Sequence, residues 1–379
     1  MTILLTGGGT GGHITPIVAL AHELKRLQPE VRVIYMGEHS GKFAHMVADN
    51  PDIDEIRTIR AGKFRRYHGE SWFKRLLDVK TNVLNLRDFF YFLLGTLQAL
   101  ILMRRLKPDA ILLKGGFVGV PAGLAAAFWK IPFVTHDSDT LPGLANRLVA
   151  RWATYHATGM PAGFYHYPSQ SVKYVGVLVS DSHKPVTSSQ QAAFKRDLDI
   201  PPKSRLVLVT GGSGGAARIN TAVKQLLSKL FEDYDDLYVV HQVGKGKAGV
   251  YRGYKHPRLR VYELLDSMYK YTGASDITIT RAGANTLAEL GVQGRAGIVV
   301  PNPLLTGGHQ LTNARNLEEQ GAVVVVNETT LGSELDGAIR RLLDDAGVRH
   351  KLGSRLQAVT VLDATHQLAK VVLGVAQKN

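Results

Sequence analysis

The alternation of apolar and polar positions follows one pattern twice along the chain. An apolar run at residues 3–6 leads into GGGTGGH, and apolar positions then recur at helical spacing over residues 15–27. A second run at residues 205–210 leads into GGSGGAA and a helical pattern over residues 217–230. A strand, a glycine-rich turn and a helix form the start of a Rossmann-like unit. The sequence therefore predicts an α/β fold of two doubly wound units rather than one long sheet.

Further short apolar runs alternate with helical stretches, as strands do in parallel sheets. We predict strands in the first half at residues 31–37, 110–116 and 131–137, and in the second half at residues 237–244, 259–264, 276–283, 296–302 and 322–327.

A polar, proline-marked stretch near residues 175–185 separates the two halves. We place the first Rossmann-like domain at residues 1–177 and the second at residues 178–353. A closing helix within residues 354–379 is a candidate to return to the first domain.

Composition narrows the chemistry. The length of 379 residues fits two domains, and the absence of cysteine excludes disulfides, thiolate nucleophiles and cysteine-bound metals. The formal net charge is +14, and residues 57–107 alone carry twelve Lys and Arg against three Asp and Glu. The basic charge is therefore concentrated in one stretch.

Aromatic and leucine side chains are interleaved with these charges, a combination that suits an anionic bilayer surface. The predicted membrane-contact residues are Phe64, Arg65, Arg66, Trp72, Phe73 and Leu76. A solvated basic face is the alternative, and nucleic acid is disfavoured because no recognised nucleic-acid motif accompanies the charge. The apolar stretch Phe89 to Met103 is shorter than the roughly 20 residues of a membrane span, so it predicts a buried or interfacial helix.

The first glycine loop formally matches a dinucleotide fingerprint, and Glu38 stands where such a site has its ribose-binding acid. An oxidoreductase is therefore one alternative. The second glycine loop and a third glycine pair at residues 115–116 favour instead a cleft lined with backbone N–H groups, which suits a diphosphate and sugar oxygens.

His13 stands at the end of the first loop, where a helix is about to start. The positive end of a helix disfavours the imidazolium ion, so a neutral His13 can accept a proton from an acceptor hydroxyl. A histidine that only hydrogen-bonds the loop is the alternative.

Two later segments have the residues of a sugar-nucleotide site. In TRAGANTLAE, at residues 280–289, a helix begins near Ala284, and its first N–H groups can hold a phosphate without a metal. Glu289 lies about one turn in and can accept both hydroxyls of a ribose, unless it is an ordinary first-turn acid. GGHQLTNA, at residues 307–314, supplies amide side chains for sugar hydroxyls or forms a simple polar loop.

Asp137 and Asp139 form a D-x-D pair, a pattern that holds a divalent metal in some glycosyltransferases. The pattern is common by chance, and further instances such as Asp52 with Asp54 and Asp197 with Asp199 occur in the chain. Because these residues end a predicted strand, orientation of the acceptor is the interpretation that we prefer.

Six segments together are similar to one family. GGGTGGHITP, GGFVGVPAGLAA, HDSDTLPGLANR, TGGSGGAARIN, RAGANTLAE and HQLTNA stand in the order found in the MurG family, glycosyltransferase family 28. The resemblance implies the GT-B fold, in which two Rossmann-like domains face a central cleft. It also implies an inverting transfer from UDP-N-acetylglucosamine that needs no cofactor and no metal, and peripheral association with the cytoplasmic face of the cell membrane.

The same resemblance assigns roles to individual residues. It implies His13 as the catalytic base, and Gly116, Phe117, Asp137 and Asp139 as residues that orient the acceptor. The donor-binding residues that it implies are Thr10, Gly11, Gly12, Ser213, Leu265, Ala284, Asn285, Thr286, Glu289, His309 and Gln310.

The chain departs from the family pattern at four places. The family's His-Glu-Gln-Asn is His136 to Asp139 here, and its Gly-Asn-Pro-x-Arg is Gly176 to Ser180, without the arginine. Leu264 stands where an aromatic residue caps the uracil, and His309 replaces a glutamine.

The sequence thus predicts transfer of N-acetylglucosamine to an undecaprenyl-diphosphate-linked N-acetylmuramoyl-pentapeptide, with a UDP-sugar, this lipid-linked glycopeptide and an anionic inner membrane surface as partners. A related GT-B enzyme with another UDP-sugar or acceptor, and a non-catalytic sugar-nucleotide binder, are the alternatives.

Overall fold

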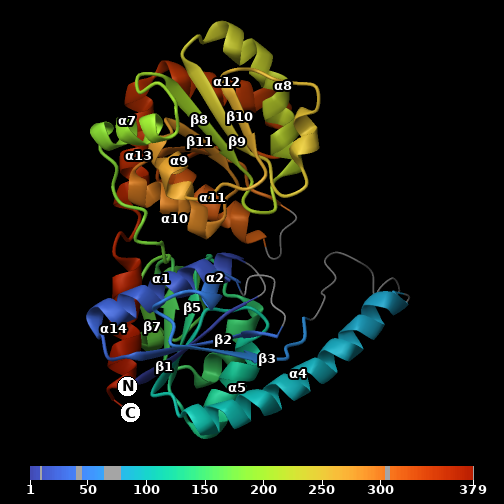
Figure 1. The fold of residues 1–379 in the computed structure, drawn as a ribbon, viewed down its shortest axis with the longest axis vertical. Helices are drawn as coiled ribbons and strands as arrows, with labels where there is room; N and C mark the ends of the chain where they lie inside the picture. The colour runs from blue at the N-terminus through green and yellow to red at the C-terminus, as the bar shows by residue number, and fades with distance from the viewer. Residues whose placement is uncertain (9–10, 40–44, 64–77, 304–307, 379) are drawn as a thin grey trace. The chain divides into compact units, whose positions relative to one another are not determined.

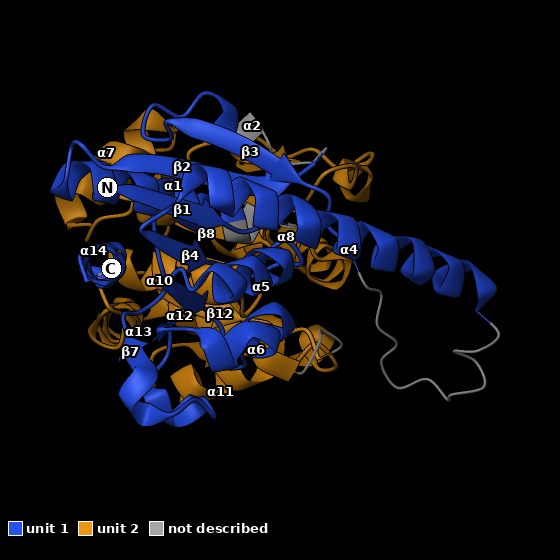
Figure 2. Cartoon of the chain, turned by 90° about the horizontal axis from the view of Figure 1, so that it is seen from below, with its two compact units in different colours: residues 1–180, 363–379 blue, residues 181–362 orange. Residues whose placement is uncertain are grey.

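The structure is a computed structural model that describes residues 1–8, 11–39, 45–63, 78–303 and 308–378, with the backbone alone at residues 11–13, 45 and 46. The chain divides into two compact units (Figure 2). Unit 1 comprises residues 1–180 and 363–379, and unit 2 comprises residues 181–362. The boundary thus follows Ser180 rather than residue 177, and the returning segment is shorter than residues 354–379.

Unit 1 is a doubly wound α/β unit (Figure 1). Its described strands are all parallel, in the order β3-β2-β1-β4-β5-β6-β7. The strands are β1 (Thr2–Thr6), β2 (Arg32–Glu38), β3 (Glu55–Ile59), β4 (Ala110–Leu113), β5 (Phe133–Asp137), β6 (Tyr155–Thr158) and β7 (Val172–Tyr174). The helices are α1 (Gly11–Leu27), α2 (His45–Ala48), α4 (Val79–Leu106), α5 (Gly119–Trp129), α6 (Leu144–Val149) and α14 (Ala364–Ala376), with 3-10 turns at Ala150–Trp152, Ala162–Phe164 and Ser169–Ser171.

The order of the strands reverses between β1 and β4. Thr6 at the end of β1 pairs with Met36 on one side and with Leu113 on the other. In open α/β sheets such a switch point, at the carboxyl ends of the strands, is where ligands bind. The loops after β1 and β4 are therefore the first place to look for a site in unit 1.

Each face of this sheet is covered by its own helices. Leu4, Ile111 and Leu113 pack into a core formed with α4 and α5. On the other face α1 and α14 pack together, and Nδ1 of His366 on α14 lies 2.5 Å from Oε1 of the buried Glu23 on α1. Arg26 donates to both oxygens of Glu23, and these contacts lower the pKa of its carboxyl. The last helix of the chain is therefore part of unit 1.

Unit 2 repeats the architecture with a shorter sheet. Its described strands are parallel, in the order β10-β9-β8-β11-β12-β13. The strands are β8 (Arg205–Thr210), β9 (Leu237–Gln242), β10 (Leu259–Tyr262), β11 (Ile277–Thr280), β12 (Ala296–Val299) and β13 (Val324–Val325). The helices are α7 (Ser188–Asp197), α8 (Ala217–Asp233), α9 (Met268–Ala274), α10 (Ala284–Gln293), α11 (His309–Glu319), α12 (Leu331–Asp344) and α13 (Ala346–Ala358), with a 3-10 turn at Ala248–Tyr251.

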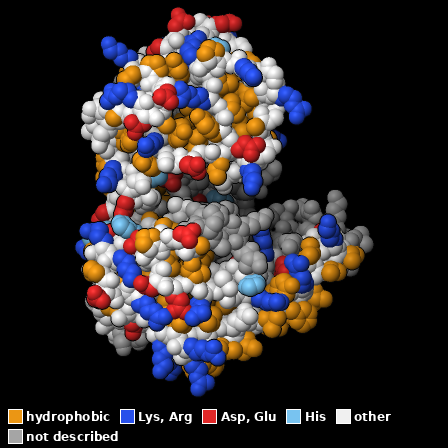
Figure 3. All heavy atoms as spheres, viewed as in Figure 1, with side chains coloured by type: hydrophobic (Ala, Val, Ile, Leu, Met, Phe, Trp, Pro, Cys, Tyr) orange, Lys and Arg blue, Asp and Glu red, His pale blue; other side chains and the backbone are white. Residues whose placement is uncertain are grey.

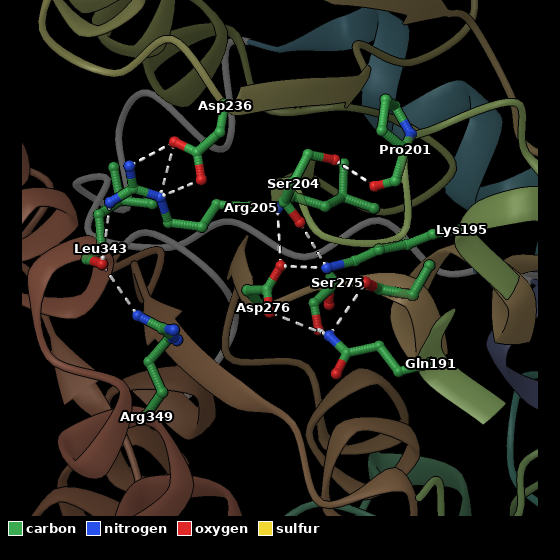
Figure 4. Close-up of polar contacts among 12 residues, drawn as sticks. Gln191, Lys195, Pro201, Ser204, Arg205, Asp236, Ser275, Asp276, Leu343 and Arg349 are labelled. Atoms are coloured by element: carbon green, nitrogen blue, oxygen red, sulfur yellow. Dashed lines mark hydrogen bonds and ion pairs between the residues drawn. The ribbon is translucent and has the colours of Figure 1, made fainter. Parts of the chain in front are cut away.

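An ion pair with a buried lysine lies at the amino edge of this second sheet (Figure 4). Asp276, just before β11, accepts from Lys195 Nζ at 2.7 Å and from Gln191 Nε2 at 3.0 Å, both on α7. It also accepts from the backbone N–H of Leu206 at 2.7 Å. These contacts hold α7 at the amino edge of the sheet. The glycine loop lies at the opposite, carboxyl edge, after β8.

The predicted strands are all present, although several are shorter than the apolar runs suggested. The apolar pattern missed three strands of unit 1, namely β3, β6 and β7. β3 and β7 are the edge strands of the sheet and have exposed, polar residues, so they lack the apolar run of a buried parallel strand. Helix α1 begins at Gly11 rather than Thr15, which places His13 in its first turn.

Candidate functional site

In unit 1 the loops after β1 and β4 are in backbone contact. Gly116 has φ +80°, and a Cβ atom on it would lie 2.3 Å from the carbonyl oxygen of Gly8. Tyr35 on β2 donates from its hydroxyl to the carbonyl of Gly7 at 2.8 Å. Glycine is therefore required at residue 116 both by its dihedral angle and by the neighbouring loop. The switch point of this sheet is therefore formed by two backbone loops in close contact.

A cluster of polar side chains lies beside these loops. Lys114 follows β4 and is 3% exposed, and its Nζ donates to Ser138 Oγ at 2.8 Å. Burial lowers the pKa of Lys114 to about 8, and Asp137 and Asp139 oppose that shift. Burial and the charge of Lys114 both hold the pKa of His136 well below its usual range, so His136 is neutral. Its Nε2 lies 3.0 Å from the carbonyl of Gly176.

The four residues His136 to Asp139 divide into two pairs. His136 and Asp137 are buried, whereas Ser138 and Asp139 are partly exposed. Asp137 Oδ1 accepts from the backbone of Gly143 and from Asn146 Nδ2, both at 2.9 Å.

The other carboxylate oxygen, Asp137 Oδ2, accepts from the hydroxyl of Tyr167 at 3.0 Å. Burial raises the pKa of Asp137, and these hydrogen bonds act in the opposite direction. Asp137 therefore holds its own loop in place. Of the two aspartates expected at the acceptor, Asp139 is the one with partly exposed surface.

In unit 2 a residue that the sequence patterns did not single out makes hydrogen bonds to the second glycine loop. Gln242, at the end of β9 and 2% exposed, donates to Thr210 Oγ1 and to the carbonyl of Gly212, both at 3.2 Å. Its Oε1 accepts from the backbone N–H of Leu265 at 2.9 Å. One amide thus ties the loop that contains Ser213 to a second predicted donor residue. A polar residue at the end of a buried strand is the signal that points to it.

The predicted phosphate-binding helix start is present. Helix α10 begins at Ala284 after the N-cap Gly283, so residues 284–286 form its first turn, in which N–H groups have no partner within the helix. Burial raises the pKa of Glu289, one turn further on, to about 7. A carboxyl group in that range can be fully ionised by donors from a bound ligand.

The residues of α11 have mixed roles. Gln310 is 8% exposed, and its Oε1 accepts from the backbone of Asn302 at 3.0 Å. Asn313 donates to the carbonyl of Ala282, just before the first turn of α10. His309 is the first residue of α11 and is partly exposed. The buried amides therefore position the loops, and His309 is the more accessible side chain of the predicted sugar-contacting pair.

A second candidate surface lies on α4 in unit 1. Large apolar side chains recur at helical spacing along one side of this helix and are exposed (Figure 3). We call this set the α4 stripe: Val79, Val83, Leu86, Phe90, Leu93, Leu97 and Ile101, which are 45–67% exposed. The buried residues of the helix are Asp88, Gly95, Ala99 and Met103.

Helix α4 contacts the rest of unit 1 through the side on which its small residues lie. A Cβ atom on Gly95 would lie 1.8 Å from the carbonyl oxygen of Arg60, so the helix backbone approaches that segment closely. Trp129 Nε1 also donates to the carbonyl of Leu100 at 3.0 Å. By length and composition α4 is the one helix among the described residues that is long enough and apolar enough to cross a membrane. Its contacts with unit 1 instead hold it on the surface of that unit.

Several predicted residues lie outside the described part of the chain. They are Thr10 and the membrane-contact set Phe64, Arg65, Arg66, Trp72, Phe73 and Leu76. For Gly11, Gly12 and His13 the backbone alone is described. Among the described residues no three His, Asp or Glu side chains gather as a metal site. The expectation of a metal-independent and cofactor-independent reaction stays a prediction.

Two doubly wound units in one chain, each with a glycine-rich loop at its switch point, have the architecture of the GT-B glycosyltransferases. Comparison with known proteins agrees. The family model of the glycosyltransferase family 28 N-terminal domain matches residues 3–158, and that of the C-terminal domain matches residues 206–368. The chain belongs to glycosyltransferase family 28.

Two curated relatives cover nearly the whole chain. One from Symbiobacterium thermophilum is 31% identical over 100% of this chain and 97% of its own length. One from Bacillus subtilis is 30% identical over 98% of this chain and 99% of its own. Both are named UDP-N-acetylglucosamine–N-acetylmuramyl-(pentapeptide) pyrophosphoryl-undecaprenol N-acetylglucosamine transferase. The crystal structure of Acinetobacter baumannii MurG has the same fold, with a TM-score of 0.72 and 24% identity over 98% of this chain and 99% of that one.

Proposed function

We propose that this protein transfers N-acetylglucosamine from UDP-N-acetylglucosamine to an N-acetylmuramoyl-pentapeptide linked to undecaprenyl diphosphate, at an anionic membrane surface. The observation that carries the proposal is full-length similarity, at 30–31% identity, to relatives named for this reaction. An acceptor hydroxyl attacks the anomeric carbon, the bond from that carbon to UDP breaks with inversion, and the hydroxyl proton passes to a base, for which we propose His13.

Groups of unit 2 support the donor part of the proposal. The first turn of α10 and the loop with Ser213 present N–H groups to the diphosphate, which carries the negative charge that develops as UDP leaves. Glu289 accepts the two ribose hydroxyls. Because its pKa is about 7 before the donor binds, the ionised form that accepts these hydrogen bonds is favoured above neutral pH.

The α4 stripe supports the membrane part of the proposal. Its large apolar side chains are flanked on the same helix by Lys80, Arg87, Arg104 and Arg105, and the stretch around them has the highest basic charge in the chain. An apolar face with cations at its borders suits the interface of an anionic bilayer, into which the apolar side chains insert.

Vesicle co-sedimentation tests the membrane contact. Wild-type protein is expected to bind phosphatidylglycerol vesicles more tightly than phosphatidylcholine vesicles. The double variant Phe90→Ser/Leu97→Ser should lose at least about tenfold in binding, since each large apolar side chain contributes about 1.5–3 kcal/mol when buried. The matched control is Leu148→Ser/Leu362→Ser, which removes equally exposed leucines elsewhere. Equal losses in both double variants would contradict a specific role of the stripe.

The donor and acceptor are tested by a screen. Purified protein, supplied with membranes and the lipid-linked muramoyl-pentapeptide, should use UDP-N-acetylglucosamine in preference to other UDP-sugars. Preference for another nucleotide sugar or another lipid acceptor would keep the family and replace the proposed substrates.

A further inference from the structure

The buried lysine of unit 1 lies at the switch point of the sheet. The backbone N–H of Lys114 donates to the carbonyl of Thr6 at 2.8 Å, so the residue stands between the ends of β1 and β4. Its Nζ atom donates to Ser138 Oγ at 2.8 Å. A buried ammonium is costly unless it is paired or has a function. The position of Lys114 is thus that of a ligand site, next to the contact between Gly8 and Gly116.

Pairing with Asp137 does not account for Lys114 by itself. The two oxygens of Asp137 already accept from Gly143, Asn146 and Tyr167. The hydrogen bond that Lys114 makes is instead with Ser138, which is partly exposed. Since the oxygen of Ser138 accepts from the ammonium, the hydroxyl proton of Ser138 is directed away from Lys114. Within the described residues no acceptor for that proton is found.

The charges around Lys114 decide which ligand group fits. From β5 and the residues after it the ammonium faces Asp137, Asp139 and the neutral His136. Both carboxylates offset the charge of the ammonium, so Lys114 attracts a diphosphate less strongly than a lone ammonium would. They suit a neutral sugar hydroxyl or an N-acetyl oxygen, to which Ser138 can donate and beside which Asp139 can accept.

We propose that Ser138 is an acceptor-binding residue that donates to a neutral oxygen of the acceptor sugar, and that Lys114 is the positioning residue that orients and polarises the Ser138 hydroxyl. This inference rests on the proposed function, in which unit 1 takes the acceptor. It assigns the departure from the family's pattern at residue 138, together with Lys114, to recognition of the acceptor sugar.

Steady-state kinetics with both substrates tests the pair. Ser138→Ala should raise the KM for the lipid-linked acceptor about three- to tenfold, the usual effect of one lost hydrogen bond, and leave the KM for UDP-N-acetylglucosamine unchanged. Ser138→Thr, which keeps the hydroxyl, should restore the acceptor KM. Lys114→Met should raise the acceptor KM at least as much as Ser138→Ala. If Lys114→Met fails to fold, the two Ser138 variants decide.

The pH dependence separates positioning from a structural role. In the wild type the acceptor KM should rise as pH increases through about 8, because Lys114 then loses the proton that orients Ser138. In Ser138→Ala that rise should be absent, since the side chain that Lys114 orients is gone. Undecaprenyl diphosphate without a sugar, used as a competitive inhibitor, should have the same inhibition constant with wild type and Ser138→Ala.

Each outcome has a defined meaning. Unchanged acceptor KM in Ser138→Ala, or a pH-dependent rise in KM that persists in that variant, overturns the pair while leaving the proposed function intact. A larger inhibition constant for the sugar-free diphosphate in Ser138→Ala overturns the assignment of Ser138 to the acceptor sugar. A wild type that forms no product with this acceptor overturns the proposed function itself.

Discussion

The two units share one architecture and differ at the carboxyl edges of their sheets. In unit 2 that edge presents a helix start at Ala284, a glycine loop held by Gln242 and the carboxyl group of Glu289. In unit 1 it presents the buried Lys114 with Ser138 and two aspartates. The first set suits a diphosphate and a ribose, and the second suits neutral sugar oxygens. The shared scaffold therefore does not set the ligand, whereas the loops at its switch points do.

The long helices of the two units differ in the side chains that they bury. Helix α8 buries large apolar side chains such as Ile219, Val223 and Leu227 against its sheet. Helix α4 does the reverse, because it buries Gly95 and Ala99 and exposes the α4 stripe. The two helices therefore differ in which side chains they bury: α8 buries large apolar residues, whereas α4 leaves most of its large apolar residues exposed.

The largest expected effect separates the roles of the two glycine loops. His13→Ala should lower kcat about 10²–10⁴-fold, the usual contribution of a general base, while the affinity for UDP-N-acetylglucosamine is retained. Ser213→Ala, in the corresponding loop of unit 2, should mainly weaken donor binding. Single-turnover kinetics and calorimetric titration of the donor measure the two effects. Wild-type turnover in His13→Ala shows that another group is the base.

Matched glycine substitutions test whether both switch points need close backbone contact. Gly116→Ala in unit 1 and Gly215→Ala in unit 2 each place a Cβ atom within 2.3 Å of a carbonyl oxygen, at positive φ. Each should lower the free energy of unfolding by about 2–4 kcal/mol. Gly212→Ala, which has positive φ but open space, should cost about 1–2 kcal/mol. Urea unfolding measures all three, and equal losses would show that the contacts are not tight.

The carboxyl group of Glu289 should make donor binding weaker at low pH, whereas acceptor binding is expected to weaken as pH increases through about 8. Since the pKa of free Glu289 is about 7 and the donor requires the ionised form, donor affinity should fall as pH decreases below 7. Glu289→Gln should bind the donor about tenfold more weakly and lose this dependence. Calorimetric titration of the donor between about pH 5.5 and about pH 8.5, roughly 1.5 pH units on either side of the pKa, measures this dependence. The same slope in Glu289→Gln would assign the titration to another group.

The smallest expected effect concerns the uracil. Leu264 is 58% exposed where the family has an aromatic side chain. Leu264→Phe should tighten UDP binding a few-fold by stacking, an interaction worth about 0.5–1.5 kcal/mol. A competition assay with UDP measures the change. Weaker binding in this variant would show that residue 264 does not face the base.

The sequence predicted the fold well because both glycine loops follow strands that are buried on both faces. Edge strands such as β3 have no such pattern and were missed. The roles of the candidate site residues stay predictions. Motifs singled out Ala284 and Glu289, but neither Gln242 nor Lys114 belongs to a local motif, because each contacts residues brought together by the sheet.

The exposure of α4 also required three-dimensional information. Its apolar run is compatible with burial until the structure shows that small residues such as Gly95 and Ala99 are buried while most of the large ones are exposed. A 3.6-residue period of the large side chains, with small residues opposite, was the available signal.

One measurement tests the central claim most directly. Purified protein is incubated with labelled UDP-N-acetylglucosamine, the undecaprenyl-diphosphate-linked muramoyl-pentapeptide and anionic vesicles, and the lipid and nucleotide products are quantified. We expect lipid-linked disaccharide and UDP in equal amounts. UDP release without transfer of label to the lipid, or no reaction at all, contradicts the account.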